Sequence, residues 1–364
     1  MKRPDLDPET VAWTLGGLAV AGAIVGAAVV FLGLYNVSAR VGHFPGVGPV
    51  LHTTFRNSVD LRAMSVDDVP ELTDEMAALG AKHFDAACAD CHSAPGRGRT
   101  ATMRAMSPLP PHITQAVGHW NPAELHWIVR EGVKMSGMPH WPADRDEEVW
   151  PVVAFLTRVQ EGMDGAAYTE MTGMEKTAAR DFAYCTSCHG ERGATDNPHI
   201  PRLDILSRTY MTEALSAYRR GARDSGIMEH AATEVTPAAL AEYAERFAGF
   251  APEGGSVNGA DGDLVTRGRA LSRAEDSTRV PACAACHGPW PDQLDEAFPS
   301  LAGQNQSYLG QQLTLWRDGQ RGGGRVRELM HLAAEELTDA DIEALAAYYA
   351  SLAPATLNET AEAE

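Results

Sequence analysis

All six cysteines of this 364-residue chain lie in three motifs of one pattern, Cys-x-x-Cys followed at once by His. The motifs occupy residues 88–92, 185–189 and 283–287. Two cysteines three positions apart on a helical turn form thioethers with both vinyl groups of one haem, and the adjacent histidine binds its iron. The sequence therefore predicts three covalently attached haem c groups, each with one iron. The attachment residues are Cys88, Cys91, Cys185, Cys188, Cys283 and Cys286, and the iron ligands are His92, His189 and His287.

Two other chemistries use paired cysteines. A structural zinc site usually needs four ligands, often from two Cys-x-x-Cys knuckles. A thioredoxin-like redox pair belongs to a βαβ pattern, which this chain lacks. The histidine that follows every pair favours haem over both.

The second and third motifs belong to an internal repeat. An offset of 98 residues relates Cys185, Cys188 and His189 to Cys283, Cys286 and His287. It also relates Pro201 to Pro299, Leu203 to Leu301, Tyr210 to Tyr308, Leu215 to Leu313, Arg219 to Arg317 and Gly221 to Gly319. Four extra residues in the region 322–327 then raise the offset to 102. So many matched positions indicate duplication of one folded unit.

Methionines are the expected second axial ligands of the two repeated units. Met330 is the one methionine that follows the third motif, so we expect it opposite His287. The offset of 102 then matches Met228 to Met330 and nominates it as the partner of His189. Met211 is the alternative, but it falls on a predicted helix at a position suited to core packing.

The first segment offers two methionines, Met135 and Met138. We favour Met138 as the partner of His92, because the following proline holds its loop rigid. Histidines are the other candidate distal ligands, namely His112, His119, His126, His140, His199, His230 and His331. Methionine ligation raises the haem potential, and a six-coordinate iron has no open position for a substrate. Both points predict an electron carrier with no catalytic residues.

The N-terminal region reads as a membrane anchor. Residues 10–39 carry no charge, and the apolar stretch 11–35 would span roughly 37 Å as a helix, enough for a bilayer core. Lys2 and Arg3 precede it and place the N-terminus in the cytoplasm. The alternative is a cleaved signal peptide ending near residues 37–39, although signal peptides have shorter apolar regions. Both readings export the rest of the chain to the periplasm.

The remaining chain reads as all-α. Apolar residues at i, i+3, i+4 and i+7 predict helices over 149–156 and 342–349, the latter with Thr338 as N-cap. We divide the chain into an anchor (1–40), a connector (41–74), haem domains (75–161, 174–250 and 263–353) and an acidic tail (354–364). Residues 162–173 and 251–262 read as linkers. The formal net charge of −19 disfavours nucleic-acid binding.

These motifs carry a resemblance to known families. Residues from about 175 to 353 resemble the dihaem cytochrome c4 family through their two haem motifs, the Pro-Ser-Leu-Ala-Gly-Gln run at 299–304, Tyr308, the stretch 313–319, Met228 and Met330. The second unit departs from this pattern, with Pro-Arg-Leu-Asp at 201–204. Residues from about 75 to 160 are similar to a monohaem class I cytochrome c, with Gly80, Phe84, the first haem motif and Met138.

The resemblance implies three class I cytochrome c-like domains working in respiratory or photosynthetic electron transfer. A quinol-cytochrome c oxidoreductase or a periplasmic dehydrogenase would reduce the chain. A terminal oxidase or a photosynthetic reaction centre would oxidise it. The alternative function is a haem enzyme, a peroxidase or a small-substrate reductase, with one five-coordinate haem.

Overall fold

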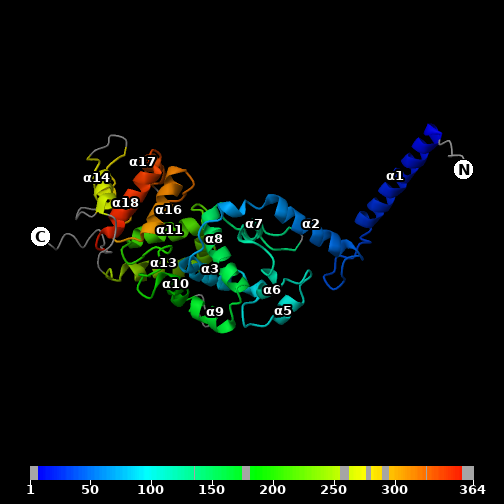
Figure 1. Ribbon diagram of the computed structural model, residues 1–364, viewed down its shortest axis with the longest axis horizontal. Helices are drawn as coiled ribbons and strands as arrows, with labels where there is room; N and C mark the ends of the chain where they lie inside the picture. Colours follow the sequence, from blue (N-terminus) through cyan, green and yellow to red (C-terminus); the bar gives the residue numbers. More distant parts are fainter. Residues whose placement is uncertain are drawn as a thin grey trace.

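The computed structural model of the chain describes residues 7–134, 136–173, 181–254, 262–275, 280–288, 295–324 and 326–354. Within these ranges the fold is helical, and the one β-type pairing is an isolated bridge between Val133 and Met138. The predicted all-α class is therefore confirmed. The domains follow one another along an elongated molecule, with the N-terminal helix projecting from one end and the last domain at the other (Figure 1).

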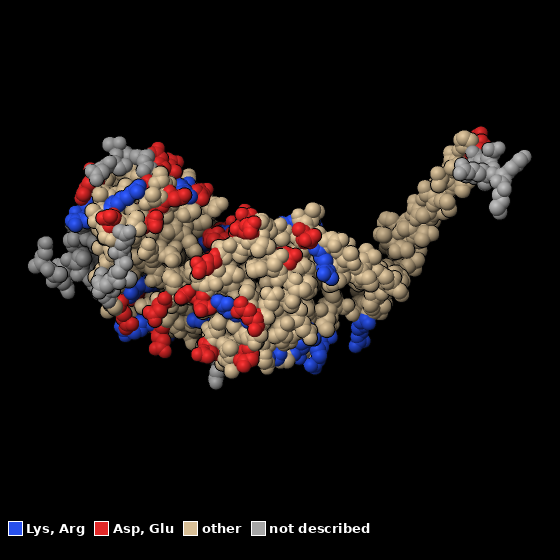
Figure 2. Space-filling model, viewed as in Figure 1, with Lys and Arg blue, Asp and Glu red and all other residues tan. Residues whose placement is uncertain are grey.

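Helix α1 (Pro8–Phe31) stands away from the body of the protein. Asp7 caps its first turn, and none of its side chains is buried against the rest of the molecule. Its surface in Figure 2 is almost free of charged side chains, in contrast to the body. Among the described residues it is the one helix long and apolar enough to cross a membrane. Lys2 and Arg3 lie outside the described residues.

The first haem domain is built on a crossing of two helices. Its elements are η1 (Val66–Asp68), α3 (Asp74–Ala87), α4 (Ala89–His92), α5 (Ala101–Arg104), α6 (Ile113–Ala116), α7 (Pro122–Glu131), η2 (Asp146–Glu148) and α8 (Val149–Gln160). Helices α3 and α8 touch backbone to backbone at Gly80, where an added Cβ would lie 1.9 Å from the carbonyl oxygen of Pro151. Phe84 and Phe155 pack together beside this crossing, with ring centroids 5.0 Å apart and ring planes tilted by 43°. The helix predicted at 149–156 is α8.

Two segments around this domain are more ordered than their sequence indicates. Residues 162–173, which read as a linker, contain helix α9 (Gly165–Thr172). Its Tyr168 is fully buried in the first core and donates a 2.6 Å hydrogen bond to Asp85. The connector forms helix α2 (Val47–Arg62), whose Val59 is also fully buried in that core. Each segment is attached by a few apolar side chains, such as Phe55 and Val59 in α2 and Tyr168 and Met171 in α9, too few to produce an extended periodicity.

The last four helices of the two repeated units follow one order, and the third unit has one more helix, α14, before them. The second contains α10 (Phe182–His189), α11 (Arg208–Arg219), α12 (Gly226–Thr233) and α13 (Pro237–Ala248). The third contains α14 (Gly262–Ser272), α15 (Ala284–His287), α16 (Gln306–Arg317), α17 (Arg327–Ala334) and α18 (Asp339–Ser351). Thr236 and Thr338 cap α13 and α18, as predicted for the latter. At Gly268 an added Cβ would lie 2.0 Å from the Ala344 carbonyl oxygen, so α14 and α18 repeat the close crossing of the first domain.

Candidate haem-binding site

Each Cys-x-x-Cys-His motif forms a short helical turn that ends at its histidine, in α4, α10 and α15. The six cysteines are not joined in disulfides. Burial raises the pKa of the first thiol in each motif, to about 12 at Cys88 and to about 11 at Cys185 and Cys283. A redox-active Cys-x-x-Cys pair requires the opposite shift. The turns therefore suit covalent attachment better than thiol–disulfide exchange.

The three histidines share one hydrogen bond. The Nδ1 atoms of His92, His189 and His287 lie 3.0, 3.1 and 2.9 Å from the backbone carbonyl oxygens of Pro111, Pro201 and Pro299. A carbonyl only accepts, so Nδ1 carries the proton and Nε2 keeps its lone pair. Burial also lowers the pKa of all three histidines and favours neutral rings. A backbone carbonyl that accepts from Nδ1 fixes the ring so that the free Nε2 lone pair can bind iron.

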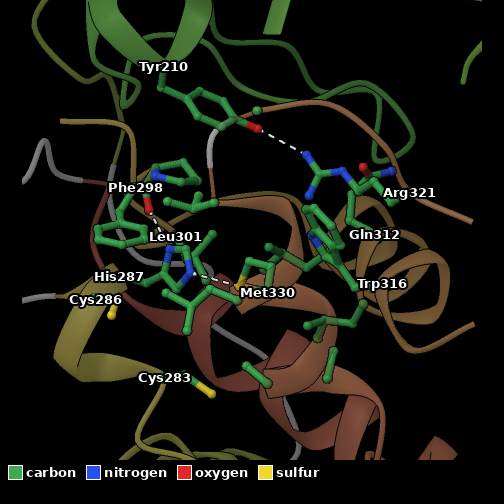
Figure 3. Close-up of a pocket in the computed structure, with 18 of the residues that line it drawn as sticks. Tyr210, Cys283, Cys286, His287, Phe298, Leu301, Gln312, Trp316, Arg321 and Met330 are labelled. Atoms are coloured by element: carbon green, nitrogen blue, oxygen red, sulfur yellow. Dashed lines mark hydrogen bonds between the residues drawn. The ribbon is translucent and has the colours of Figure 1, made fainter. Parts of the chain in front are cut away.

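The third domain brings its predicted ligand pair together. Nε2 of His287 lies 3.4 Å from Sδ of Met330 (Figure 3). The Nδ1 atom on the other side of the same ring is hydrogen-bonded to the Pro299 carbonyl oxygen. Both residues line a cavity of about 220 Å³ together with Cys283 and Cys286. The other walls are mostly apolar, and include Phe298, Leu301, Leu309, Leu313, Trp316, Leu345 and Tyr349. The cavity therefore offers what a haem c requires: two cysteines for the thioether bonds, two side chains that can bind iron, and apolar walls around the ring.

The other predicted methionines lie on matching segments but make no such contact. Met228 is on α12, half-buried against the second core, against which Cys185 also packs. Its competitor Met211 is 4% exposed inside that core, where it packs as α11 crosses its neighbours. Met138 is half-buried on the loop after α7, and Met135 lies outside the described residues. The pairings of Met228 and Met138 with their histidines stay predictions.

Two arginines, the buried Arg223 and the half-buried Arg321, extend the site across the boundary between the second and third domains. Arg223 donates hydrogen bonds to the Tyr308 hydroxyl (3.2 Å) and Gln312 Oε1 (3.1 Å) of the third domain. Arg321 donates in return to the Tyr210 hydroxyl (3.0 Å) of the second domain and lines the cavity (Figure 3). Burial alone would raise the pKa of Tyr210, but the two guanidinium groups outweigh it and lower that pKa to about 8.

These arginines fit the acidic edge of a haem. In the described part of the chain their hydrogen-bond partners are neutral hydroxyl and amide oxygens. Buried cations normally have an anionic partner, and haem propionates are anions. The sequence carried a signal for this pair, because the offset of 98 that relates Tyr210 to Tyr308 also relates Arg223 to Arg321. The proline carbonyls had a weaker signal, since Pro201 and Pro299 are matched by the repeat but Pro111 is not.

Comparisons with known proteins identify relatives of this chain. Residues 75–156 match the family model described as cytochrome c oxidase, cbb3-type, subunit III, and residues 265–353 match the model described as cytochrome c. The cytochrome c4 of Pseudomonas aeruginosa is 32% identical over 203 residues, which are 55% of this chain and 97% of the relative. The thiosulfate dehydrogenase electron acceptor of Thiomonas intermedia is 32% identical over 51% of this chain and 87% of its own length. A solved cytochrome c4 structure from Acidithiobacillus ferrooxidans is 33% identical, with a TM-score of 0.41, and covers 46% of this chain and 98% of that one.

The helical fold and the Cys-x-x-Cys-His turns define a c-type cytochrome, with covalently bound haem c and an electron-transfer function. The chain belongs to the dihaem cytochrome c4 family, and a monohaem class I cytochrome c domain precedes its c4-like part.

Proposed function

We propose that this chain is a membrane-anchored cytochrome that holds three haems and carries electrons along the periplasmic face of the cytoplasmic membrane. Haem c supplies reversible one-electron chemistry, and the chain's residues tune and place it. The proposed axial pairs are His92 with Met138, His189 with Met228 and His287 with Met330. The six motif cysteines fix the haems covalently.

The facing pair in the third domain carries this proposal. Nε2 of His287 and Sδ of Met330 lie 3.4 Å apart, and both residues line the same cavity as Cys283 and Cys286. Two axial donors leave no position for a substrate, which favours a carrier over a peroxidase or a reductase. Thioether sulfur also favours the ferrous state, which suits a carrier of fairly high potential.

The proposed electron donor is a quinol-oxidising complex or a periplasmic dehydrogenase. The relative from Thiomonas intermedia, whose name describes the electron acceptor of a thiosulfate dehydrogenase, supports a dehydrogenase of a small inorganic substrate. The proposed acceptor is a terminal oxidase or a photosynthetic reaction centre. Helix α1 would keep the haem domains at the membrane surface where such partners lie.

The test asks whether an added ligand such as carbon monoxide can bind the haem iron. It uses absorption spectra of the detergent-solubilised, fully matured protein. We expect a low-spin ferric spectrum with the weak long-wavelength band of Met–iron bonding, and no rapid binding of carbon monoxide to the reduced form. Rapid binding of carbon monoxide or cyanide to one haem would instead favour the haem-enzyme alternative. Reduction by a purified donor, followed by its absorbance change, would then identify the partner.

A further inference from the structure

The first haem domain is joined to the second at the helix that carries Met228. Glu148 of the first domain is 8% exposed and lies at the N-terminus of α12. Its Oε1 accepts a 2.5 Å hydrogen bond from the Ser225 hydroxyl, and its Oε2 accepts a 2.6 Å bond from the backbone N–H of Gly226. A carboxylate at this position satisfies one of the free N–H groups of the helix and opposes the positive end of its dipole.

A buried ion pair holds that carboxylate in place. Arg145 is 7% exposed, and its Nη1 lies 2.5 Å from Oε1 of Glu148. The same guanidinium donates to the Asp224 carbonyl oxygen, and the Asp224 side chain accepts from the backbone N–H of Asp144. The first domain therefore contacts three consecutive residues, 224–226, that lead into Met228.

Trp141 of the first domain packs against the same end of α12. An added Cβ at Gly226 would lie 2.3 Å from the indole Nε1 of Trp141, so the ring packs directly on the helix backbone. That Nε1 is buried and has no hydrogen-bond partner among the described residues.

The first domain also contacts the haem motif of the second domain. Lys82 Nζ donates a 2.5 Å hydrogen bond to the carbonyl oxygen of Ser187, which lies between the two motif cysteines in the sequence.

The third domain provides a built-in comparison. Helix α17, which carries Met330, begins after Val326 without a side-chain cap, whereas α12 has both its own Ser225 and Glu148 from another domain. Of the two repeated units, only the second therefore has this additional support at its methionine helix.

We propose that Glu148 and Trp141 are positioning residues that fix helix α12 and thereby hold Met228 on the iron of the second haem. The first domain then controls the ligation and potential of its neighbour besides carrying its own haem. This inference rests on the proposed function, because it requires Met228 to be an axial ligand.

The main test replaces Glu148 in the full-length, haem-loaded protein. The Glu148→Gln side chain has nearly the same volume as glutamate. Its NH2 group would face either the Ser225 hydroxyl or the Gly226 N–H, which both donate to Glu148, so α12 loses part of its N-terminal cap. We expect one haem's share of the Met–iron band to weaken, its potential to fall, and its affinity for carbon monoxide to rise about tenfold, which is the effect of one lost hydrogen bond. The signals of the other two haems should not change.

Glu147→Gln is the matched control. Glu147 is the neighbouring acid and also pairs with Arg145, but through Nε, and its side chain is 35% exposed. Like Glu148→Gln, the Glu147→Gln variant removes one negative charge, but Glu147 does not contact α12. The spectra of all three haems should therefore be those of the wild type. Equal effects of the two variants on the second haem would show an electrostatic effect and overturn the positioning role.

A steric pair tests the same contact without changing charge. Gly226→Ala places a methyl group against the indole and should displace α12, with the same loss at the second haem. Trp141→Phe removes the atoms that the methyl group would meet and costs no hydrogen bond. The double variant should therefore recover the wild-type signal, and failure to recover it would contradict the role of Trp141.

Met228→Ala separates this inference from the proposed function. If Met228→Ala leaves every Met–iron signal unchanged, the ligand assignment fails and the inference falls with it. If Met228→Ala abolishes one signal but Glu148→Gln and Gly226→Ala do not affect it, the ligand assignment stands and the positioning role alone is wrong.

Discussion

Nε2 of His287 and Sδ of Met330 face each other at 3.4 Å, although the two residues are 43 positions apart in the chain. The histidine ends the short helix α15, and the methionine lies in the first turns of α17. Their approach depends on the packing of α16 and α18, which brings both residues to one apolar cavity. The relationship has consequences that spectroscopy measures directly.

Replacing Met330 with Ala should open one coordination position in the third domain. The Met–iron band should lose one haem's share, carbon monoxide should bind that haem, and its potential should fall, because the soft thioether no longer favours ferrous iron. The chain should still fold, since the thioether bonds and His287 retain the haem. Unchanged spectra and potential would show that Met330 is not the ligand.

Three haem motifs predict three haem adducts in the mass spectrum of the denatured, matured protein. Replacing Cys283 and Cys286 together with Ala should leave two covalent adducts, because each thioether forms from one cysteine thiol and neither thiol of the third motif remains. Two or fewer adducts in the wild-type chain would contradict the predicted stoichiometry.

The exposed apolar helix α1 should keep the protein in the membrane fraction after washing with high salt, which removes proteins bound only by charge. A variant lacking residues 1–40 and carrying a cleavable export signal should be soluble in the periplasm with the same haem spectrum. Recovery of a wild-type chain that begins near residue 40 in the soluble fraction would instead show that α1 is a signal peptide.

Gly80→Ala should destabilise the first domain, because its Cβ would lie 1.9 Å from the Pro151 carbonyl oxygen at the α3–α8 crossing. We expect a loss of about 1–3 kcal/mol in the free energy of unfolding, measured by denaturant titration. Gly310→Ala is the control, since this helical glycine of α16 has open space around it. It should raise stability by about 0.5–1 kcal/mol through helix propensity.

The boundary between the first two domains should weaken in acid through His83. This ring is buried between Trp141 and His230, and burial, together with the charge of His230, lowers its pKa to about 3. A histidine with a lowered folded pKa contributes stability above its unfolded pKa of about 6.5, which is lost as the pH falls toward 3. The slope from His83 alone is at most about 1.4 kcal/mol per pH unit.

His83→Leu should therefore flatten the acid side of the stability curve between pH 6.5 and 3 relative to the wild type. Thermal unfolding of both proteins at pH 7 and pH 5 measures the difference, and the haem absorbance reports whether the domains stay intact. Parallel curves for the two proteins would show that His83 does not titrate in this window.

The sequence by itself determined the haem attachment motifs, the repeat and the helical class. These features are local or periodic. The spacing of Cys88, Cys91 and His92 falls within one helical turn, and the cap at Thr338 and the apolar spacing of α18 involve neighbouring residues. The offset that matches Met228 with Met330 survives because both units keep the same order of helices.

Only the tertiary structure decided what the domains do to one another. Glu148 meets Gly226 across 78 positions, and Arg223 meets Tyr308 across 85. Tyr168 and Val59 anchor segments that read as linker and connector. Such contacts produce no periodic pattern in the sequence, because each involves only one or a few side chains. They follow from the way complete helices pack, so their partners are fixed only once the domains are folded and docked.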